Sequence, residues 1–536
     1  PTADDRPFLA RIRGRAVLSL DLMKAAAAEV PGGSAEEIER QYFGRVISEP
    51  VDPPTETEPK GPFKGLRTMF TGFREINARR SFRFEALTSI DTTERLLIAP
   101  PECSVVSTDQ LLAYRHRVLD LAGRLIAAEI AVAAAAAAAY RGVELFLEPH
   151  VGDAAAGLAQ RLTAGGIDPC GAQVALHTCD IAEQALSNAD LAETVSGLSA
   201  RDPAVLEMLE QSAQGLELLA AVEEELGRSG SASVFAGETW AESRGLAWQL
   251  ISQAVQVQRS GRRAMVSMSA REETLRDIES LFATSWKWRF QRVVTGQIVD
   301  VRRRMLRRLV DDAVEFLHLR EKTKSAVLAL GGEVRRVHLE LGHRLFESGA
   351  LATPVDIDLL AAQELEFAIN GRGPSPWELD RRRVALEQMS EDDSIPQIFV
   401  GDPNRTLGDI PTPTGDLFTG WGASAGEYTG TARIITKATE PIEPGDILVA
   451  RTTDPAWTPL FLTAGAIVVE EGGPLSHAAI IARELGLPAV LNVPGLVSRL
   501  KGKGTVQLRV DGDRGVVAIL DPDSDVAHDK VLEVTG

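Results

Sequence analysis

The sequence predicts a multidomain protein in which a mostly α-helical domain is followed by a small β/α domain. Over residues 110–395, apolar residues recur almost throughout at three- and four-residue spacing, which is the helical period. Beyond residue 415 the pattern changes to short β-like runs with one clear helix at 476–486. A chain of 536 residues has room for both domains.

We expect a helical domain at 1–395, a linker at 396–414 and the β/α domain at 415–525. The linker holds several prolines and no helical period, so it is expected to be stiff and extended. A tether of this kind would let the small domain move as a unit, although a plain spacer has the same composition. The β-like runs of the last domain are TARIIT (431–436), DILVART (446–452), AIVVE (466–470), PAVLNV (488–493) and VQLRV (506–510).

Composition narrows the classes of function. Hydrophobic residues make up 44% and charged residues 25% of the chain, as in soluble globular proteins, and the net charge is −19. An acidic chain is not expected to bind nucleic acid or an anionic membrane surface. The alanine-rich stretch at 130–140 is too short to span a bilayer, which needs about 20 apolar residues, so we expect a tightly packed core helix there.

The three cysteines show no disulfide or CxxC spacing, and the N-terminus shows no secretory signal, so we expect a cytoplasmic protein. Cys170 and Cys179 flank His177, but three possible ligands in one segment do not complete a zinc site. We therefore predict no metal site in this chain.

The stretch GGPLSHAAIIARELG (472–486) carries the strongest chemical signal. Ser476 is a favoured N-cap, so His477 would occupy the first turn of the helix. Gly472 and Gly473 let the backbone turn closely and leave room beside the ring. A helix start stabilises a bound anion and disfavours the imidazolium, which keeps the ring neutral and nucleophilic. The position suits a phosphohistidine; a histidine that only packs or caps is the alternative.

The residues around this histidine resemble the swivelling phosphohistidine domain of the PEP-utilizing enzymes, the superfamily of PEP synthase, pyruvate phosphate dikinase and rifampin phosphotransferase. The resemblance includes GGPLSHAAIIARELGLPAV and extends upstream through GWGASAGEYTGTARII (420–435), GDILVARTTDPAWTPLF (445–461) and AGAIVVEEGG (464–473). It implies that His477 carries a phosphoryl group, with Gly472, Gly473 and Ser476 supporting the phosphate.

Within the superfamily the chain is most similar to the rifampin phosphotransferase-like branch. Only about a dozen residues follow ILDPDSD, which leaves no room for a PEP-binding barrel. The motif TDPAWTPLF also resembles the sequence of this branch. Residues 8–44 and 317–351 resemble parts of its acceptor-binding domain, the latter as a late helix pair. The resemblance implies that Arg320 and Lys324 serve phosphoryl transfer.

The spacing of Arg320 and Lys324 also suits phosphoryl transfer on physical grounds. Residues four apart share one helix face, so both cations can reach one phosphoryl group. Arginine can hold two phosphate oxygens and lysine adds a point charge, which together stabilise the charge of a transferring group. A solvated helix face is the alternative, because REKTK (320–324) is a common kind of surface run.

The family loads its histidine from ATP through an ATP-grasp domain, and no such nucleotide site is evident here. We therefore expect a separate ATP-grasp protein to bind ATP and Mg²⁺ and to load His477; loss of that domain from this chain by truncation is the alternative. The phosphoryl group would then pass to a hydroxyl or enol of a small molecule, giving AMP, phosphate and a phosphorylated acceptor. Residues 150–270 do not resemble the family's acceptor domain, so rifampin is not implied. A synthetase that uses the phosphorylated acceptor as an intermediate and a non-catalytic phosphocarrier remain alternatives.

Overall fold

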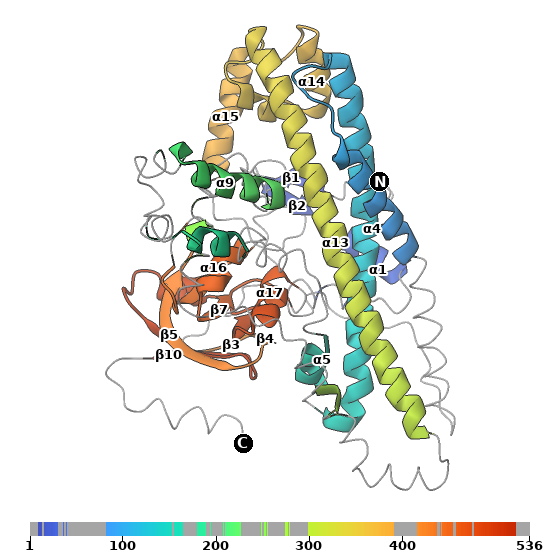
Figure 1. The fold of residues 1–536 in the computed structure, drawn as a ribbon, viewed down its shortest axis with the longest axis vertical. Helices are drawn as coiled ribbons and strands as arrows, with labels where there is room; N and C mark the ends of the chain where they lie inside the picture. The colour runs from blue at the N-terminus through green and yellow to red at the C-terminus, as the bar shows by residue number, and fades with distance from the viewer. Residues whose placement is uncertain are drawn as a thin grey trace.

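The computed structural model describes two connected parts, an elongated helical body and a rounded sheet domain beside it (Figure 1). Apart from a few single residues, the described segments are 9–12, 15–29, 82–152, 155–163, 180–188, 210–226, 298–390, 415–436, 442–453, 457–473 and 476–520. The expected division into a helical part and a β/α part is confirmed at this level. The expected linker at 396–414 lies outside the described residues.

Two long helices form the framework of the helical body. α4 (Thr108–Val151) begins at an N-capping box in which Ser107 and Gln110 bond to each other's backbone, and α13 (Ile298–Glu347) runs beside it in the opposite direction (Figure 1). Their apolar faces form one continuous core. The smaller elements of the body are β1 (Leu9–Ile12), β2 (Arg15–Leu18), α1 (Leu20–Glu29), a helix over 82–98, α5 (Ala155–Thr163) and α9 (Ala213–Leu226).

The alanine-rich stretch lies at the centre of α4. Every residue of 132–140 is buried, so the prediction of a tightly packed core helix is confirmed. By length and composition alone α4 could cross a membrane, but 61% of its apolar window is buried inside the protein. That burial is the pattern of a core helix. Alanine side chains let neighbouring helices approach closely around this segment.

The expected late helix pair at 317–351 is wrong, because α13 continues unbroken to Glu347. Gly331 and Gly332 lie within it without ending it. Each of these adjacent glycines weakens the helix by about 1 kcal/mol, and the buried packing of the flanking Leu330 and Val334 offsets this cost.

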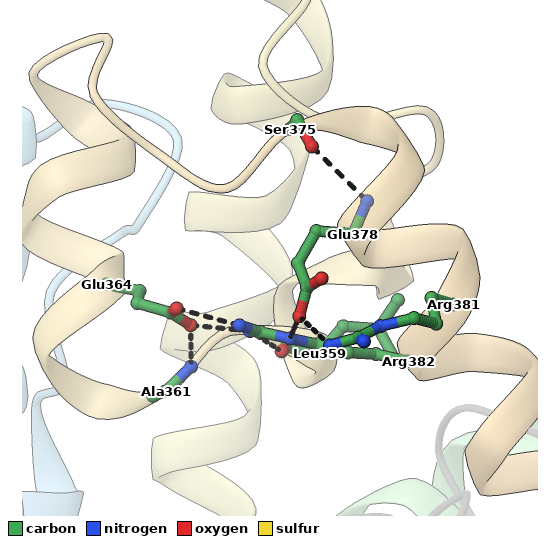
Figure 2. Close-up of polar contacts among 7 residues, drawn as sticks. All are labelled: Leu359, Ala361, Glu364, Ser375, Glu378, Arg381 and Arg382. Atoms are coloured by element: carbon green, nitrogen blue, oxygen red, sulfur yellow. Dashed lines mark hydrogen bonds and ion pairs between the residues drawn. The ribbon is translucent and has the colours of Figure 1, made fainter.

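A network of ion pairs joins the elements at the end of the helical body that lies opposite α5 (Figures 1 and 2). The Arg382 guanidinium donates to the Glu364 carboxylate at 2.6 and 2.9 Å, to Glu378 at 3.2 Å and to the Leu359 carbonyl at 2.9 Å. These contacts join η3 (Pro354–Leu359), α14 (Ala362–Ile369) and α15 (Pro376–Ser390). They lower the pKa of the Glu364 carboxyl to about 2, with the Arg382 hydrogen bond as the main cause.

The second part is an eight-stranded mixed sheet in the order β3-β10-β9-β5-β6-β7-β8-β4. β5 to β8 are parallel neighbours, and the remaining pairs are antiparallel. The elements are β3 (Leu417–Thr419), β4 (Trp421–Ser424), β5 (Glu427–Ile434), β6 (Ile447–Ala450), α16 (Thr458–Thr463), β7 (Ala466–Val469), α17 (His477–Leu485), β8 (Ala489–Leu491), α18 (Leu496–Leu500), β9 (Gln507–Asp511) and β10 (Val516–Leu520). The five expected β-like runs and the helix at 476–486 are confirmed; α16 and α18 were not anticipated.

Glycines let this sheet fold back on itself. β3 and β4 stand at opposite ends of the strand order, yet a single residue, Gly420, separates them in the chain. The Gly420 amide donates to the Gly515 carbonyl at 2.8 Å, and the Gly512 amide to the Gly426 carbonyl at 2.8 Å. A Cβ on Gly512 would lie 1.9 Å from the Ser424 carbonyl oxygen. Only glycine permits this backbone approach.

Replacing Gly512 by alanine is therefore expected to destabilise the sheet domain by about 3 kcal/mol, because neither backbone can move away without breaking the crossing. Hydrogen–deuterium exchange of peptides from β5 to β9 measures the effect. Gly123→Ala is the matched control: Gly123 lies in α4 with no neighbour near an added Cβ, so this change should stabilise the body by about 1 kcal/mol. Unchanged exchange in Gly512→Ala would contradict the close crossing.

Candidate functional site

The turn before α17 presents His477 as the sequence predicts. Ser476 is the N-cap, and its hydroxyl accepts a hydrogen bond from the Ala479 amide at 3.4 Å. Gly472 has φ of +152°, a conformation that L side chains rarely adopt, and the Ser476 amide donates to the Gly473 carbonyl at 3.0 Å. The glycine pair and the cap together fix the first residue of the helix, which is His477.

The imidazole is almost fully enclosed, with 6% of His477 exposed. Its Nε2 lies 3.2 Å from the hydroxyl of Thr458, the first residue of α16, and its ring lies 5.9 Å from the Phe461 ring, tilted by 32°. A hydroxyl at this distance can donate to or accept from the ring nitrogen, so the direction of this hydrogen bond depends on the tautomer of the neutral imidazole.

Arg320 and Lys324 of α13 lie within electrostatic range of this ring. The pKa of His477 is lowered well below its ordinary value, first by burial and then by the positive charges of Lys324 and Arg320. The sequence predicts a neutral ring because of the helix start; burial and these two cations favour the same state. The structure thus brings together the three side chains that the sequence singles out for chemistry.

The two cations are held differently. Arg320 is 6% exposed, and its Nη1 donates to the Glu321 carboxylate at 2.6 Å, whereas Lys324 is half-buried. A solvated helix face is therefore wrong for Arg320. Both cations can offset the charge of a phosphoryl group on His477, because water screens charges less in a partly enclosed site.

A further contact joins the sheet domain to the helical body. The side-chain amide of Gln160, on α5, donates to the backbone carbonyl of Ala423 and lies 3.4 Å from that of Gly422, both on β4. The same Ala423 carbonyl accepts from Arg483 Nε at 2.7 Å, and Arg483 belongs to α17. This contact fixes the arrangement in which His477 faces α13.

Sequence reasoning missed Thr458 and Gln160. Thr458 lies within the TDPAWTPLF motif, where Pro459 in the first turn marks a helix start, so a signal for α16 was present. Gln160 lies in a segment without a recognised motif, and tertiary contact alone identifies it.

Thr458→Val is expected to slow phosphorylation of His477 about tenfold, because one buried hydrogen bond of about 1.4 kcal/mol is lost at the reacting ring. Valine keeps the volume, so packing against His477 stays similar. The nitrogen chemical shifts of the imidazole, measured by NMR, should show a changed tautomer balance. Equal loading rates and identical shifts would rule out this role for the hydroxyl.

Within the described ranges, no group of three or more His, Cys, Asp or Glu side chains is arranged to hold a metal ion. Cys170, Cys179 and His177 lie outside those ranges.

Comparison with known proteins agrees with this geometry. The family described as PEP-utilising enzyme, mobile domain, matches residues 442–515, which include α16 and the His477 turn. The chain carries the mobile domain of the PEP-utilising enzymes. The resemblance to that superfamily, and to its rifampin phosphotransferase-like branch, is confirmed.

Proteins similar to this chain include rifampicin phosphotransferases. One from a Streptomyces species is 33% identical over 40% of this chain and 25% of its own length; one from Bacillus subtilis is 30% identical over 40% and 25%. Chondramide synthase from Chondromyces crocatus is 32% identical over 35% of this chain and 5% of its own length. The matched region thus spans about a quarter or less of each relative.

Proposed function

We propose that this chain is a phosphotransferase component that carries a phosphoryl group on His477 and delivers it to a small-molecule acceptor at the helical body. The observation that supports this most is the meeting of His477, at a capped helix start, with Arg320 and Lys324 of α13. A nucleophilic imidazole and two cations are the groups that phosphoryl transfer requires on the carrier and on the receiving side.

The state of His477 suits its role. In the described arrangement the lowered pKa keeps the ring unprotonated near neutral pH. The helix start belongs to the mobile domain itself and disfavours the imidazolium in any position of that domain, so a ring nitrogen can attack phosphorus when the histidine is loaded. Once phosphorylated, the group carries negative charge beside Lys324 and Arg320, which stabilise it as it leaves for the acceptor oxygen.

Burial of His477 argues for movement of the mobile domain. With 6% of the residue exposed, a donor protein cannot reach the ring in the arrangement in which it faces α13. Loading therefore requires the domain to leave α13 and to break the Gln160 contact with β4. We propose that the described arrangement is the delivery state.

The phosphoryl donor is proposed to be ATP, held with Mg²⁺ by an ATP-grasp protein or domain outside the described residues. ATP supplies the phosphoryl group, and with one water molecule the remainder of ATP is released as AMP and phosphate. The acceptor is proposed to be a small molecule with a hydroxyl or enol.

Mixing the chain with a candidate ATP-grasp protein, ATP and a metabolite extract tests the proposal. The expected result is AMP together with phosphate bound to an organic product. Free phosphate with a newly joined organic product would indicate a synthetase, and stable phosphorylation of His477 without product would indicate a carrier. Absence of any label on the chain would overturn the proposal.

A further inference from the structure

Glu129 is an acidic side chain in the middle of α4 to which the proposed function assigns no role. Contacts between the long helices locate it. The Tyr114 hydroxyl donates to Glu333 Oε1 at 2.7 Å near one end of the contact, and a Cβ on Gly142 would lie 3.6 Å from Leu309 near the other. Glu129 lies close to the midpoint of this antiparallel stretch. The register therefore sets it opposite the turn of α13 that bears Arg320 and Lys324.

Electrostatic interactions agree with the placement of Glu129 opposite Arg320 and Lys324. Burial raises the pKa of the Glu129 carboxyl, Arg320 and Lys324 oppose the rise, and Glu321 adds to it; the net shift is upward. The same two cations, Arg320 and Lys324, also act electrostatically on His477, which belongs to the mobile domain. Glu129 and His477 thus share one pair of cations, with one group on the helical body and the other on the carrier.

The carboxylate is also available for chemistry. Glu321, the other acid of this site, is bound by Arg320 Nη1 at 2.6 Å. Across the segments that the structure describes, no hydrogen bond engages the Glu129 carboxylate. Its neighbours one turn away on α4, Leu125 and Ala133, are apolar. An acid with a raised proton affinity, beside a cation pair and without a fixed partner, is placed as general bases are.

We propose that Glu129 is the general base that removes the proton from the acceptor hydroxyl as the phosphoryl group leaves His477. In this step the acceptor oxygen bonds to phosphorus, the P–N bond breaks, and its electron pair returns to the imidazole. The hydroxyl proton passes to the Glu129 carboxylate and then to solvent. The inference rests on the proposed function and narrows it: a base is needed for a neutral alcohol and is not needed for an acceptor that is already an oxyanion.

The test separates loading from discharge. Phosphoramidate, a small donor that phosphorylates imidazoles in water, loads the full-length protein, and excess donor is then removed. Methanol serves as the hydroxyl probe, and formation of methyl phosphate and of free phosphate is followed in wild type and in Glu129→Gln. Glutamine keeps the shape of the side chain but cannot accept the proton.

Loading of His477 should be the same in both proteins. Discharge to methanol should be slower in Glu129→Gln by on the order of 10²-fold, the usual contribution of a general base. In wild type the discharge rate should rise with pH as the carboxylate ionises and then level off, whereas in Glu129→Gln this rise should be absent. Arg320, Glu321 and Lys324 on α13 and His477 on α17 also face this site, and all of them remain in the variant. Glu148→Gln, at an exposed position of α4, is the matched control and should behave as wild type.

Each other outcome has a defined meaning. If wild type accepts no phosphoryl group on His477, the proposed function fails before Glu129 is tested. If loading succeeds, the role of Glu129 is overturned by equal discharge rates in the two proteins, by a pH-dependent rise that persists in Glu129→Gln, or by wild-type discharge no faster than that of the loaded, denatured protein. A rise that persists would leave Glu129 with only a positioning role toward Arg320 and Lys324.

Discussion

Replacing His477 by alanine is expected to abolish phosphorylation of the chain and to reduce phosphoryl transfer by on the order of 10³-fold or more, as removal of a nucleophile does. No other described imidazole combines a capped helix start, near-complete burial and two neighbouring cations. Labelled phosphate from phosphoramidate or from an ATP-grasp partner, measured on the intact protein, checks the result. The wild-type label should be acid-labile, because it is linked through nitrogen.

His343→Ala is the matched control, since His343 lies exposed on α13. It should be labelled as strongly as wild type. Hydrogen exchange of α17 peptides tests whether His477→Ala keeps its fold, which the Ser476 cap should preserve. Acid-labile label that survives in a folded His477→Ala protein would place the phosphoryl group elsewhere.

Replacing Lys324 by alanine is expected to leave loading of His477 intact and to slow its discharge by about 10²–10³-fold. This is the usual loss when one electrostatic stabiliser of a transition state is removed. Loading should be spared, because the proposed function places it in a state in which the mobile domain has left α13. Single-turnover discharge of the loaded protein, to methanol or to an identified acceptor, gives the rate.

Lys322→Ala provides the control on the same helix, because Lys322 is exposed while Lys324 is half-buried. It should discharge at the wild-type rate. Arg320→Lys should also slow discharge, since lysine cannot hold two phosphate oxygens as a guanidinium does. Equal slowing by Lys322→Ala and Lys324→Ala would show that only overall positive charge matters.

Local sequence patterns predicted the parts of the fold that depend on neighbouring residues. The period of apolar residues predicted helix through α4 and α13, and the β-like runs predicted five strands of the sheet. The cap at Ser476 and the glycine pair predicted the position of His477 at the start of α17. Arg320 and Lys324 share one helix face because α13 is unbroken around them, which their spacing anticipated.

Features that arise from distant contacts were not predictable in this way. Closure of the sheet depends on close backbone contacts that Gly420 and Gly512 make with residues more than sixty positions away in the chain. Gln160 meets β4 through tertiary packing alone. Glu129 stands opposite Arg320 through the register of two helices that are far apart in the sequence, and a single glutamate beside an alanine-rich stretch carries no motif.

The measurement that tests the central claim most directly is location of the phosphoryl group by mass spectrometry at neutral or alkaline pH. Cleavage at arginine and lysine releases residues 452–483, a peptide whose single histidine is His477 and which also contains Thr458 and Ser476. After loading, this peptide should gain one phosphoryl group, fragment ions should assign it to the imidazole, and brief acid treatment should remove it. An acid-stable phosphate on Thr458 or Ser476, or an unmodified peptide from a labelled protein, would contradict the assignment of His477 as the carrier.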